Sequence, residues 1–253
     1  MNSTTSLPKQ LRVLRVAFDT HLDPWEIPAF RAAVASKVGL EHEWFHNHRN
    51  ELLPEAGNPG EQVFRTGYHY RYPLIQYKTR QYQMQQQPLL ICLDDCVEEA
   101  HKFFSQSDWN LDINGDTREL RIAKLDVQQY NLRVWEKEFH YNLFNWMALN
   151  TDNYEPWMAI DSLAERLRFL ERKLISHILA FGKGINWWLD QPLEVTITQL
   201  KREKQVQYKS IRARCFDISF KANVFLPEYI GLGKGSAKGF GVVRRSRTGN
   251  SNK

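Results

Sequence analysis

The chain has little cysteine and no long hydrophobic run. Three cysteines occur among its 253 residues, at Cys92, Cys96 and Cys215. Their number and spacing exclude a disulfide framework and a zinc ribbon. No apolar run is long enough to span a bilayer, and the first residues lack the charged start and apolar stretch of a signal peptide. We therefore expect a cytoplasmic protein with no membrane partner.

Acidic residues are scarce in the last fifth of the chain. From Lys201 to Lys253 there are thirteen Lys or Arg and three Asp or Glu, a balance of +10. The first 200 residues hold 21 basic and 26 acidic residues, a balance of −5, so the net charge of +5 hides an asymmetry. A basic C-terminal part favours an anionic partner such as nucleic acid. A solvated charged face followed by a loose tail would give the same balance.

The first half has the pattern of a β-α-β-β-α-β unit. The segment 41–60 is polar and is expected to be a loop, and Asn114-Gly115 indicates a hairpin turn. The order is that of a ferredoxin-like unit, in which two helices pack on one face of an antiparallel sheet. The expected elements are a strand over 11–18, a helix from Pro28 to Gly39, strands over 68–78 and 88–93, a helix over 94–107 and a strand over 119–127.

The second half allows the same interpretation. Residues 137–149 are either a strand or a buried helix, and Ser162 to Glu165 has the pattern of a capping box that opens a long helix. Alternating residues predict strands over 193–200 and 211–222, with a bulge at Cys215-Phe216. The whole chain therefore predicts an α+β protein with two tandem ferredoxin-like domains. We place these domains at residues 1–125 and 126–253.

A cluster of histidines follows the first predicted helix. Three of the eight histidines, His42, His46 and His48, fall within seven positions. Histidine exchanges a proton near neutral pH, so two of them could make both proton transfers of RNA cleavage without a metal. Solvated loop histidines are the alternative. The three histidines could bind zinc, but the sequence offers no fourth ligand at a suitable spacing. We therefore expect no metal and no cofactor.

A glycine-rich segment near the C-terminus is the second candidate site. Its glycines would let the backbone approach a phosphate, while its cations would neutralise charge. The spacing fits neither a Walker loop nor a dinucleotide-binding fingerprint. Phe240 could stack on a base or anchor the loop in the core. The candidate RNA-binding residues are Gly231, Gly233, Lys234, Gly235, Lys238, Gly239, Phe240, Gly241, Arg244 and Arg245.

The glycine-rich segment resembles the signature loop of the CRISPR-associated RAMP endoribonucleases that process repeat RNA. The likeness lies in Gly231-Leu-Gly233, five further residues, and then Gly239-Phe240-Gly241. A second likeness, to one subtype of that family, lies in the first half. Together the two matches span nearly the whole chain in the right order. The second match comprises Phe30-Arg31, Phe45 to His48, and residues 70–78.

The resemblance implies a metal-independent endoribonuclease that cleaves CRISPR repeat RNA. It implies attack of a 2′-hydroxyl on the adjacent phosphate, which leaves a 5′-hydroxyl and a cyclic phosphate. The general base would stand shortly after the first helix, where His48 is favoured over His46. Tyr70 is the candidate assisting residue, and Lys37 could supply charge to the transition state.

The implied partner is precursor RNA that carries the repeat, with other CRISPR effector subunits as further partners. One alternative is a non-catalytic RNA-binding subunit of an effector complex, because fold does not fix function. Such a binder would have no chemical need for the histidine cluster. A metal-dependent DNA nuclease or a zinc protein is a third hypothesis.

Overall fold

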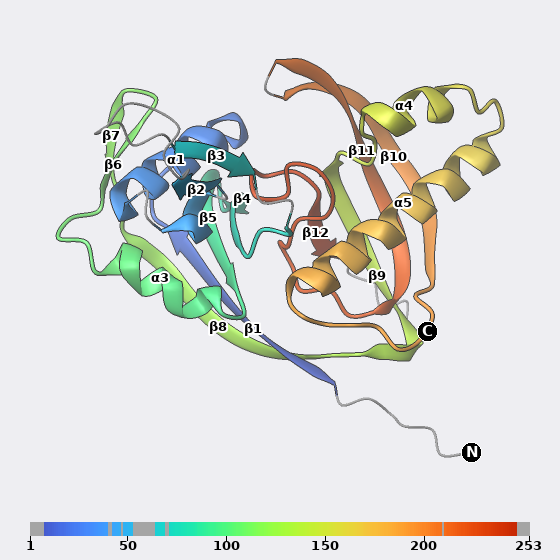
Figure 1. Cartoon of the computed structure of the whole chain (residues 1–253), viewed down its shortest axis with the longest axis horizontal. Coiled ribbons are helices and arrows are strands. Elements are labelled where there is room, and N and C mark those ends of the chain that lie inside the picture. Colours follow the sequence, from blue (N-terminus) through green and yellow to red (C-terminus); the bar gives the residue numbers. More distant parts are fainter. Residues whose placement is uncertain are drawn as a thin grey trace.

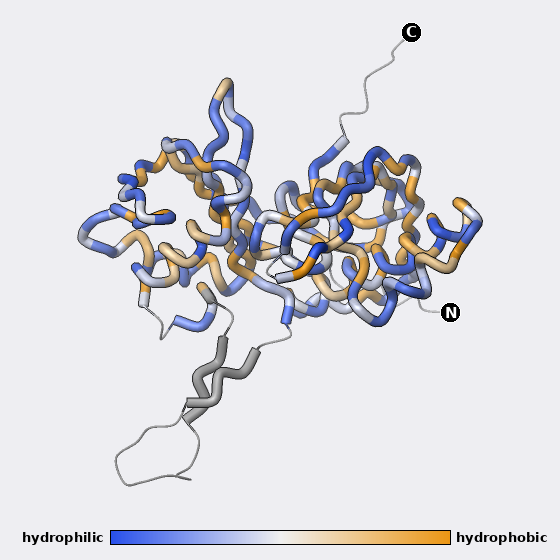
Figure 2. Tube along the Cα trace, turned by 90° about the horizontal axis from the view of Figure 1, so that it is seen from above, coloured by the Kyte–Doolittle hydropathy of each residue, from blue (hydrophilic) through white to orange (hydrophobic). Residues whose placement is uncertain are grey.

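The protein, in its computed structural model, is described for residues 8–39, 42–46, 48–52, 64–68, 71–208 and 210–246. Its two halves each contain a four-stranded antiparallel sheet with helices packed on it (Figure 1). Seen from above, they form two lobes with hydrophobic segments inside each (Figure 2). The predicted α+β architecture with two ferredoxin-like domains is confirmed. No helix in the described ranges has the length and apolar character needed to cross a membrane.

The first sheet has the strand order β4-β5-β1-β8. Two crossover helices connect its strands, and α1 buries Phe30 and Val34 against them. The main elements therefore follow the predicted β-α-β-β-α-β order. They are β1 (Lys9–Phe18), α1 (Ile27–Val38), β4 (Ile75–Tyr82), β5 (Gln85–Leu93), α3 (Cys96–Phe104) and β8 (Ile122–Leu132).

Short elements are inserted into this unit. The predicted hairpin is confirmed, with Asn114 and Gly115 both at positive φ between its strands. The prediction of a loop over 41–60 was wrong where the structure describes it, because a short helix and a strand lie there. That strand pairs with the next strand along the chain, His48 opposite Tyr68 and Leu52 opposite Phe64. Its polar sequence carries no local strand signal. The inserted elements are η1 (Pro24–Glu26), α2 (Glu43–His46), β2 (His48–Leu52), β3 (Phe64–Tyr68), β6 (Asn110–Ile113) and β7 (Asp116–Glu119).

The second sheet repeats the topology of the first, with the order β10-β11-β9-β12. Two helices connect the first strand of this unit in chain order to the second. Between β11 and β12, residues 225–241 run as an irregular segment where the first unit has its second helix. The elements are β9 (Val134–Trp146), α4 (Thr151–Met158), α5 (Leu163–Gly184), β10 (Val195–Tyr208), β11 (Ile211–Val224) and β12 (Val242–Arg245).

Local predictions for the second half had mixed outcomes. The ambiguous segment 137–149 forms the strand β9, and the register of β11 shifts between Phe216 and Ile218, next to the predicted bulge. Helix α5 begins after Ser162 as expected, but the Ser162 side chain makes no capping hydrogen bond, so the capping box was wrong. Strand β8 runs across the expected division between residues 125 and 126, and that division stays a prediction.

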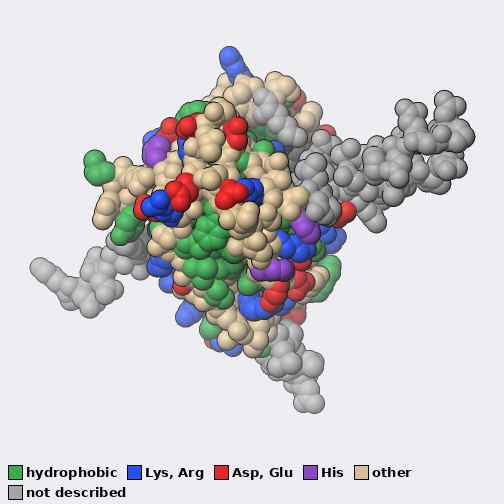
Figure 3. Space-filling view, turned by 90° about the vertical axis from the view of Figure 1, so that its left-hand side faces the viewer, with side chains coloured by type: hydrophobic (Ala, Val, Ile, Leu, Met, Phe, Trp, Pro, Cys, Tyr) green, Lys and Arg blue, Asp and Glu red, His purple; other side chains and the backbone are tan. Residues whose placement is uncertain are grey.

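The surface of the N-terminal lobe carries charges of both signs. Viewed from the left side of Figure 1, acidic and basic side chains alternate around an apolar patch (Figure 3). Ion pairs such as Arg118 with Glu26 at 2.7 Å and Arg121 with Glu119 at 2.9 Å account for this balance. A face with neutralised charge has little attraction for a polyanion.

Candidate functional site

The glycine-rich loop, residues 231–241, lies at the junction of the two domains. Its backbone runs beside β4 of the N-terminal sheet, where Tyr77 pairs with Lys238 in a parallel bridge. The Tyr77 amide donates to the Ala237 carbonyl at 3.0 Å. The loop thus extends across to the other domain and is not a free appendage of its own sheet.

Three polar side chains from the N-terminal domain hold this loop. Gln76 accepts from the Gly231 amide at 2.8 Å, and the Tyr72 hydroxyl donates to the Gly231 carbonyl at 2.8 Å. Lys78 donates to the carbonyl oxygens of Ser236 and, at 3.4 Å, Phe240. Lys78 is fully buried, and this burial lowers its pKa to about 7.

Sequence reasoning gave these three residues no role of their own. The signal was available, because a glutamine and a lysine stand in a strand whose neighbours Ile75 and Tyr77 are buried apolar residues. A buried polar side chain requires a hydrogen-bond partner. Here the partners are the loop's own backbone groups, which only the fold brings within reach.

The loop glycines are required by close packing. A Cβ atom added at Gly241 would lie 1.8 Å from the Leu232 carbonyl oxygen, and one at Gly231 would lie 2.6 Å from Lys78 Nζ. Gly241 also has a φ of +59°, a conformation that residues with a Cβ atom disfavour. At Gly239 a Cβ would lie 2.4 Å from Cδ1 of Ile27 on α1. The glycine pattern is therefore explained by contacts inside the protein, and contact of these glycines with RNA stays a prediction.

The predicted cations of this region fall into two groups. Lys234 is exposed and lies 5.6 Å from the ring of Tyr208, against which Phe240 also packs edge to face at 5.4 Å. Arg244 and Arg245 stand instead on β12. Arg244 is paired with a carboxylate on the preceding segment, while Arg245 is exposed.

A cleft of about 1320 Å³ lies beside the loop, between the two domains. The N-terminal domain contributes amide and hydroxyl side chains from β4 and β5, and the C-terminal domain contributes both arginines of β12. Amide groups and arginines offer the donors and acceptors that contact phosphates and base edges. Its lining includes Thr79, Gln81, Gln86, Asn142, Asn145, Arg244 and Arg245.

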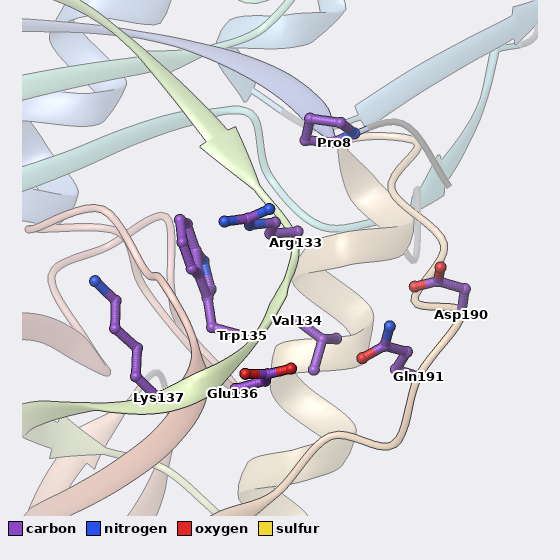
Figure 4. Close-up of a pocket in the computed structure, with 8 residues that line it drawn as sticks. All are labelled: Pro8, Arg133, Val134, Trp135, Glu136, Lys137, Asp190 and Gln191. Atoms are coloured by element: carbon purple, nitrogen blue, oxygen red, sulfur yellow. The ribbon is translucent and has the colours of Figure 1, made fainter. Parts of the chain in front are cut away.

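A second pocket, of about 540 Å³, lies where the two domains are linked (Figure 4). Arg133 and Lys137 flank the indole of Trp135, at 3.7 Å and 4.9 Å from its ring. Glu136 and Asp190 line the same pocket, so two carboxylates oppose the two cations. This balanced charge favours a polyanion less than the cleft does.

The histidine segment packs against α1 through its neighbours. Phe45 of α2 is buried in the N-terminal core, and Trp44 stacks under the Arg71 guanidinium at 4.0 Å. His46 ends α2 and His48 begins β2, but the side chains of both lie outside the described part of the structure. Tyr70 lies outside the described residues altogether. The proposed roles of these three residues stay predictions.

Lys37 and His42 have partners within the N-terminal domain. Lys37 Nζ lies 2.7 Å from Asp108 Oδ1, and this contact lowers the pKa of the Asp108 carboxyl. His42 Nδ1 lies 3.2 Å from Lys102 Nζ. A catalytic role of Lys37 stays a prediction.

A further histidine lies beside the glycine-rich loop. The Trp146 indole donates to His177 Nδ1 at 3.1 Å, and burial lowers the pKa of His177 to about 4. A Cβ atom at Gly233 would come within 3.0 Å of this ring. This lowered pKa favours the neutral form of His177 at physiological pH, and its half-buried ring lies against the loop at Gly233. No group of three metal-ligating side chains occurs within the described residues.

Two domain models of one family match the chain in consecutive order. The N-terminal domain model of Cas6b matches residues 62–131, and the C-terminal domain model of Cas6b matches residues 133–246. The chain is also 28% identical over 124 residues to an uncharacterised protein of Methanocaldococcus jannaschii. That alignment covers 49% of this chain and 82% of the other protein.

Solved structures are similar over nearly the whole chain. A crystal structure of Cas6b is 26% identical with a TM-score of 0.75, and the alignment covers 94% of this chain and 100% of that one. A crystal structure named CRISPR RNA processing endoribonuclease Cas6b is 22% identical with a TM-score of 0.64 at the same coverage. A type IV Cas6 crRNA endonuclease, 12% identical with a TM-score of 0.56 at the same coverage, shares the fold.

Proposed function

Because this chain belongs to the Cas6b family, we propose that it cleaves CRISPR repeat RNA within precursor transcripts and so produces guide RNAs. The observation that carries the proposal is the match of both Cas6b domain models, in order, from residue 62 to residue 246. A solved relative with the same fold is named a CRISPR RNA processing endoribonuclease. The basic C-terminal part and the arginine-lined cleft support an RNA partner.

The chemistry we propose needs no metal. His48 acts as general base and removes the proton from a 2′-hydroxyl, whose oxygen attacks the adjacent phosphorus. The bond from phosphorus to the 5′-oxygen breaks, and His46 protonates that oxygen as it leaves. The products are a cyclic phosphate and a 5′-hydroxyl. Tyr70 and Lys37 assist by donating to the charged transition state.

The phosphate backbone would contribute most of the binding free energy. We expect the affinity for repeat RNA to fall steeply with salt, because each neutralised phosphate releases counterions. Shape and unpaired bases would then give selectivity. Binding that does not change with salt would contradict this account.

The test is cleavage of labelled RNA that carries the repeat of the host's own array, in the presence of EDTA. Wild type is compared with His46→Ala, His48→Ala and the matched control His101→Ala, which changes an exposed histidine on α3. We expect wild type and the control to cut the RNA once. We expect no cut when the nucleotide that carries the attacking 2′-hydroxyl is replaced by its 2′-deoxy form.

Loss of the cut in His48→Ala, with RNA binding retained, would identify the base. Cleavage that appears only with added metal would contradict the mechanism. Tight binding without any cut would favour the alternative function, a non-catalytic RNA-binding subunit of an effector complex.

A further inference from the structure

Strand β8 is an uncovered edge of the N-terminal sheet. The sheet has the order β4-β5-β1-β8, so β4 and β8 are its two edges (Figure 1). The glycine-rich loop covers the β4 edge, where Tyr77 pairs with Lys238. Among the residues that the structure describes, no strand pairs with the outer side of β8. Its outward N–H and C=O groups are therefore available to a further strand.

The apolar layer of this sheet continues onto β8 and is exposed there. On β8, Leu125 lies opposite Val16 of β1. Val127 lies opposite Leu14, and both of these β1 residues are buried. Opposite and alternate residues share one face of a sheet, here the face on which Phe18 packs against α1. The side chains of Leu125 and Val127 are nevertheless 52% and 56% exposed, because the helices do not extend over this edge.

The other face of β8 carries one charge of each sign. Lys124 is exposed and has no acidic partner within the described residues. Asp126 is half-buried and lies 3.5 Å from Arg15 on β1. A lysine on an edge strand opposes pairing with another strand, unless an acidic side chain faces it there. The sequence Lys124-Leu125-Asp126 therefore fits a strand that carries the same three residues in the reverse direction.

We propose that two copies of this chain pair through their β8 strands, antiparallel, about a twofold axis at Leu125. In this register Lys124 of each copy faces Asp126 of the other, because a twofold axis repeats every contact. Ala123 faces Val127, and the two Leu125 side chains face each other. The register between β1 and β8 shifts next to Ala17, which leaves Ala123 as the extra residue of β8. Pairing from Ala123 to Val127 is thus about as long as an ordinary short strand.

The charges select this register over its neighbours. A twofold axis between antiparallel strands passes through a pair of identical residues. An axis at Lys124 would place two lysines opposite each other, and an axis at Asp126 would do the same with two carboxylates. Like charges directly opposite each other are destabilising. The axis at Leu125 instead joins the two four-stranded sheets into one and buries Leu125 and Val127 of both copies on its helix-covered face.

Cysteine cross-linking tests the register. Directly opposite residues of antiparallel strands have Cα atoms about 4.5–5.5 Å apart, which a disulfide spans. Leu125→Cys should therefore form a covalent dimer on mild oxidation. Val127→Cys is the matched control, because its two copies would lie four residues apart along the strands, about 14 Å. The native cysteines are all buried.

Exchange of the two charges tests the pairing itself. Light scattering over a dilution series measures the mass of the full chain without RNA, and we expect wild type to reach twice 29.9 kDa. Lys124→Asp and Asp126→Lys each place like charges opposite each other and should raise the dimer dissociation constant about 10-fold or more. The double variant restores opposite charges and should return to within about 3-fold of wild type. Lys201→Asp, the same change on the edge strand β10, is the control and should leave the constant unchanged.

A wild type that is monomeric over the whole dilution series would overturn the proposal. Cross-linking of Val127→Cys as fast as Leu125→Cys would also overturn it, as would a dimer unaffected by Lys124→Asp. Lys124→Asp leaves the pair of Asp126 with Arg15 in place, and a thermal melt shows that each variant is folded. The proposal is independent of RNA cleavage, so neither result depends on the activity.

Discussion

Replacing Gly241 by alanine tests whether the glycine-rich loop is fixed by packing at the domain junction. The new Cβ would lie 1.8 Å from the Leu232 carbonyl oxygen, so the backbone of one strand of the loop must move. That movement weakens two hydrogen bonds. The Leu232 amide donates to the Gly241 carbonyl at 2.8 Å, and the Gly241 amide donates to the Asn145 carbonyl at 3.1 Å. The matched control is Gly115→Ala, at a glycine with φ of +83° and nothing within 4 Å of its Cβ position.

The magnitude follows from these differences. Alanine in the left-handed region costs about 1–2 kcal/mol, and this is the whole cost expected for Gly115→Ala. Gly241→Ala adds about 1–3 kcal/mol for overpacking and about 1 kcal/mol for each weakened hydrogen bond. We therefore expect about 4–7 kcal/mol of lost stability for Gly241→Ala.

The assay is urea unfolding followed by tryptophan fluorescence, with both variants measured beside wild type. The free energy of unfolding should fall at least twice as far in Gly241→Ala as in Gly115→Ala. Equal losses in the two variants would refute the packing explanation. They would leave phosphate contact as the reason for the glycines.

Three further predictions concern the groups that surround the loop. As pH rises from 7 to 9, the free energy of unfolding of wild type should increase relative to that of Lys78→Met by about 1.4 kcal/mol per pH unit. The reason is that native Lys78 loses its proton near pH 7, while Lys78 in the unfolded chain keeps it. Urea unfolding across that range checks this, and parallel curves would contradict it. Wild type should lose about 3 kcal/mol of its free energy of unfolding as pH falls from 6.5 to 4, because the unfolded chain binds a proton that the native His177 ring does not. His177→Phe should not show this loss, and chemical denaturation at pH 6.5 and pH 4 measures the difference. Tyr72→Phe should cost about 1–2 kcal/mol, because the Gly231 carbonyl and the Gln76 amide each lose a partner; a thermal melt equal to that of wild type would show that these contacts contribute nothing.

The order of secondary structure could be predicted because it depends on local patterns. Pro28 and Gly39 mark the ends of α1, and Asn114-Gly115 forms the hairpin turn that its preference for positive φ indicates. Strand β2 was missed because its sequence, HRNEL, has none of the β-branched residues that indicate a strand. The side chain of Ser162 was likewise misread, since a capping sequence does not guarantee the hydrogen bond.

The sequence by itself determined where two candidate sites lie along the chain, a histidine cluster after the first helix and a glycine-rich loop near the end. It also determined the family resemblance, because spacing within one segment is a local property. Only the tertiary structure decided what the loop touches. Gln76 and Lys78 lie more than 150 positions before the backbone groups that they bind. Pairings over such separations arise from sheet topology and burial, and a periodicity along the chain does not contain them.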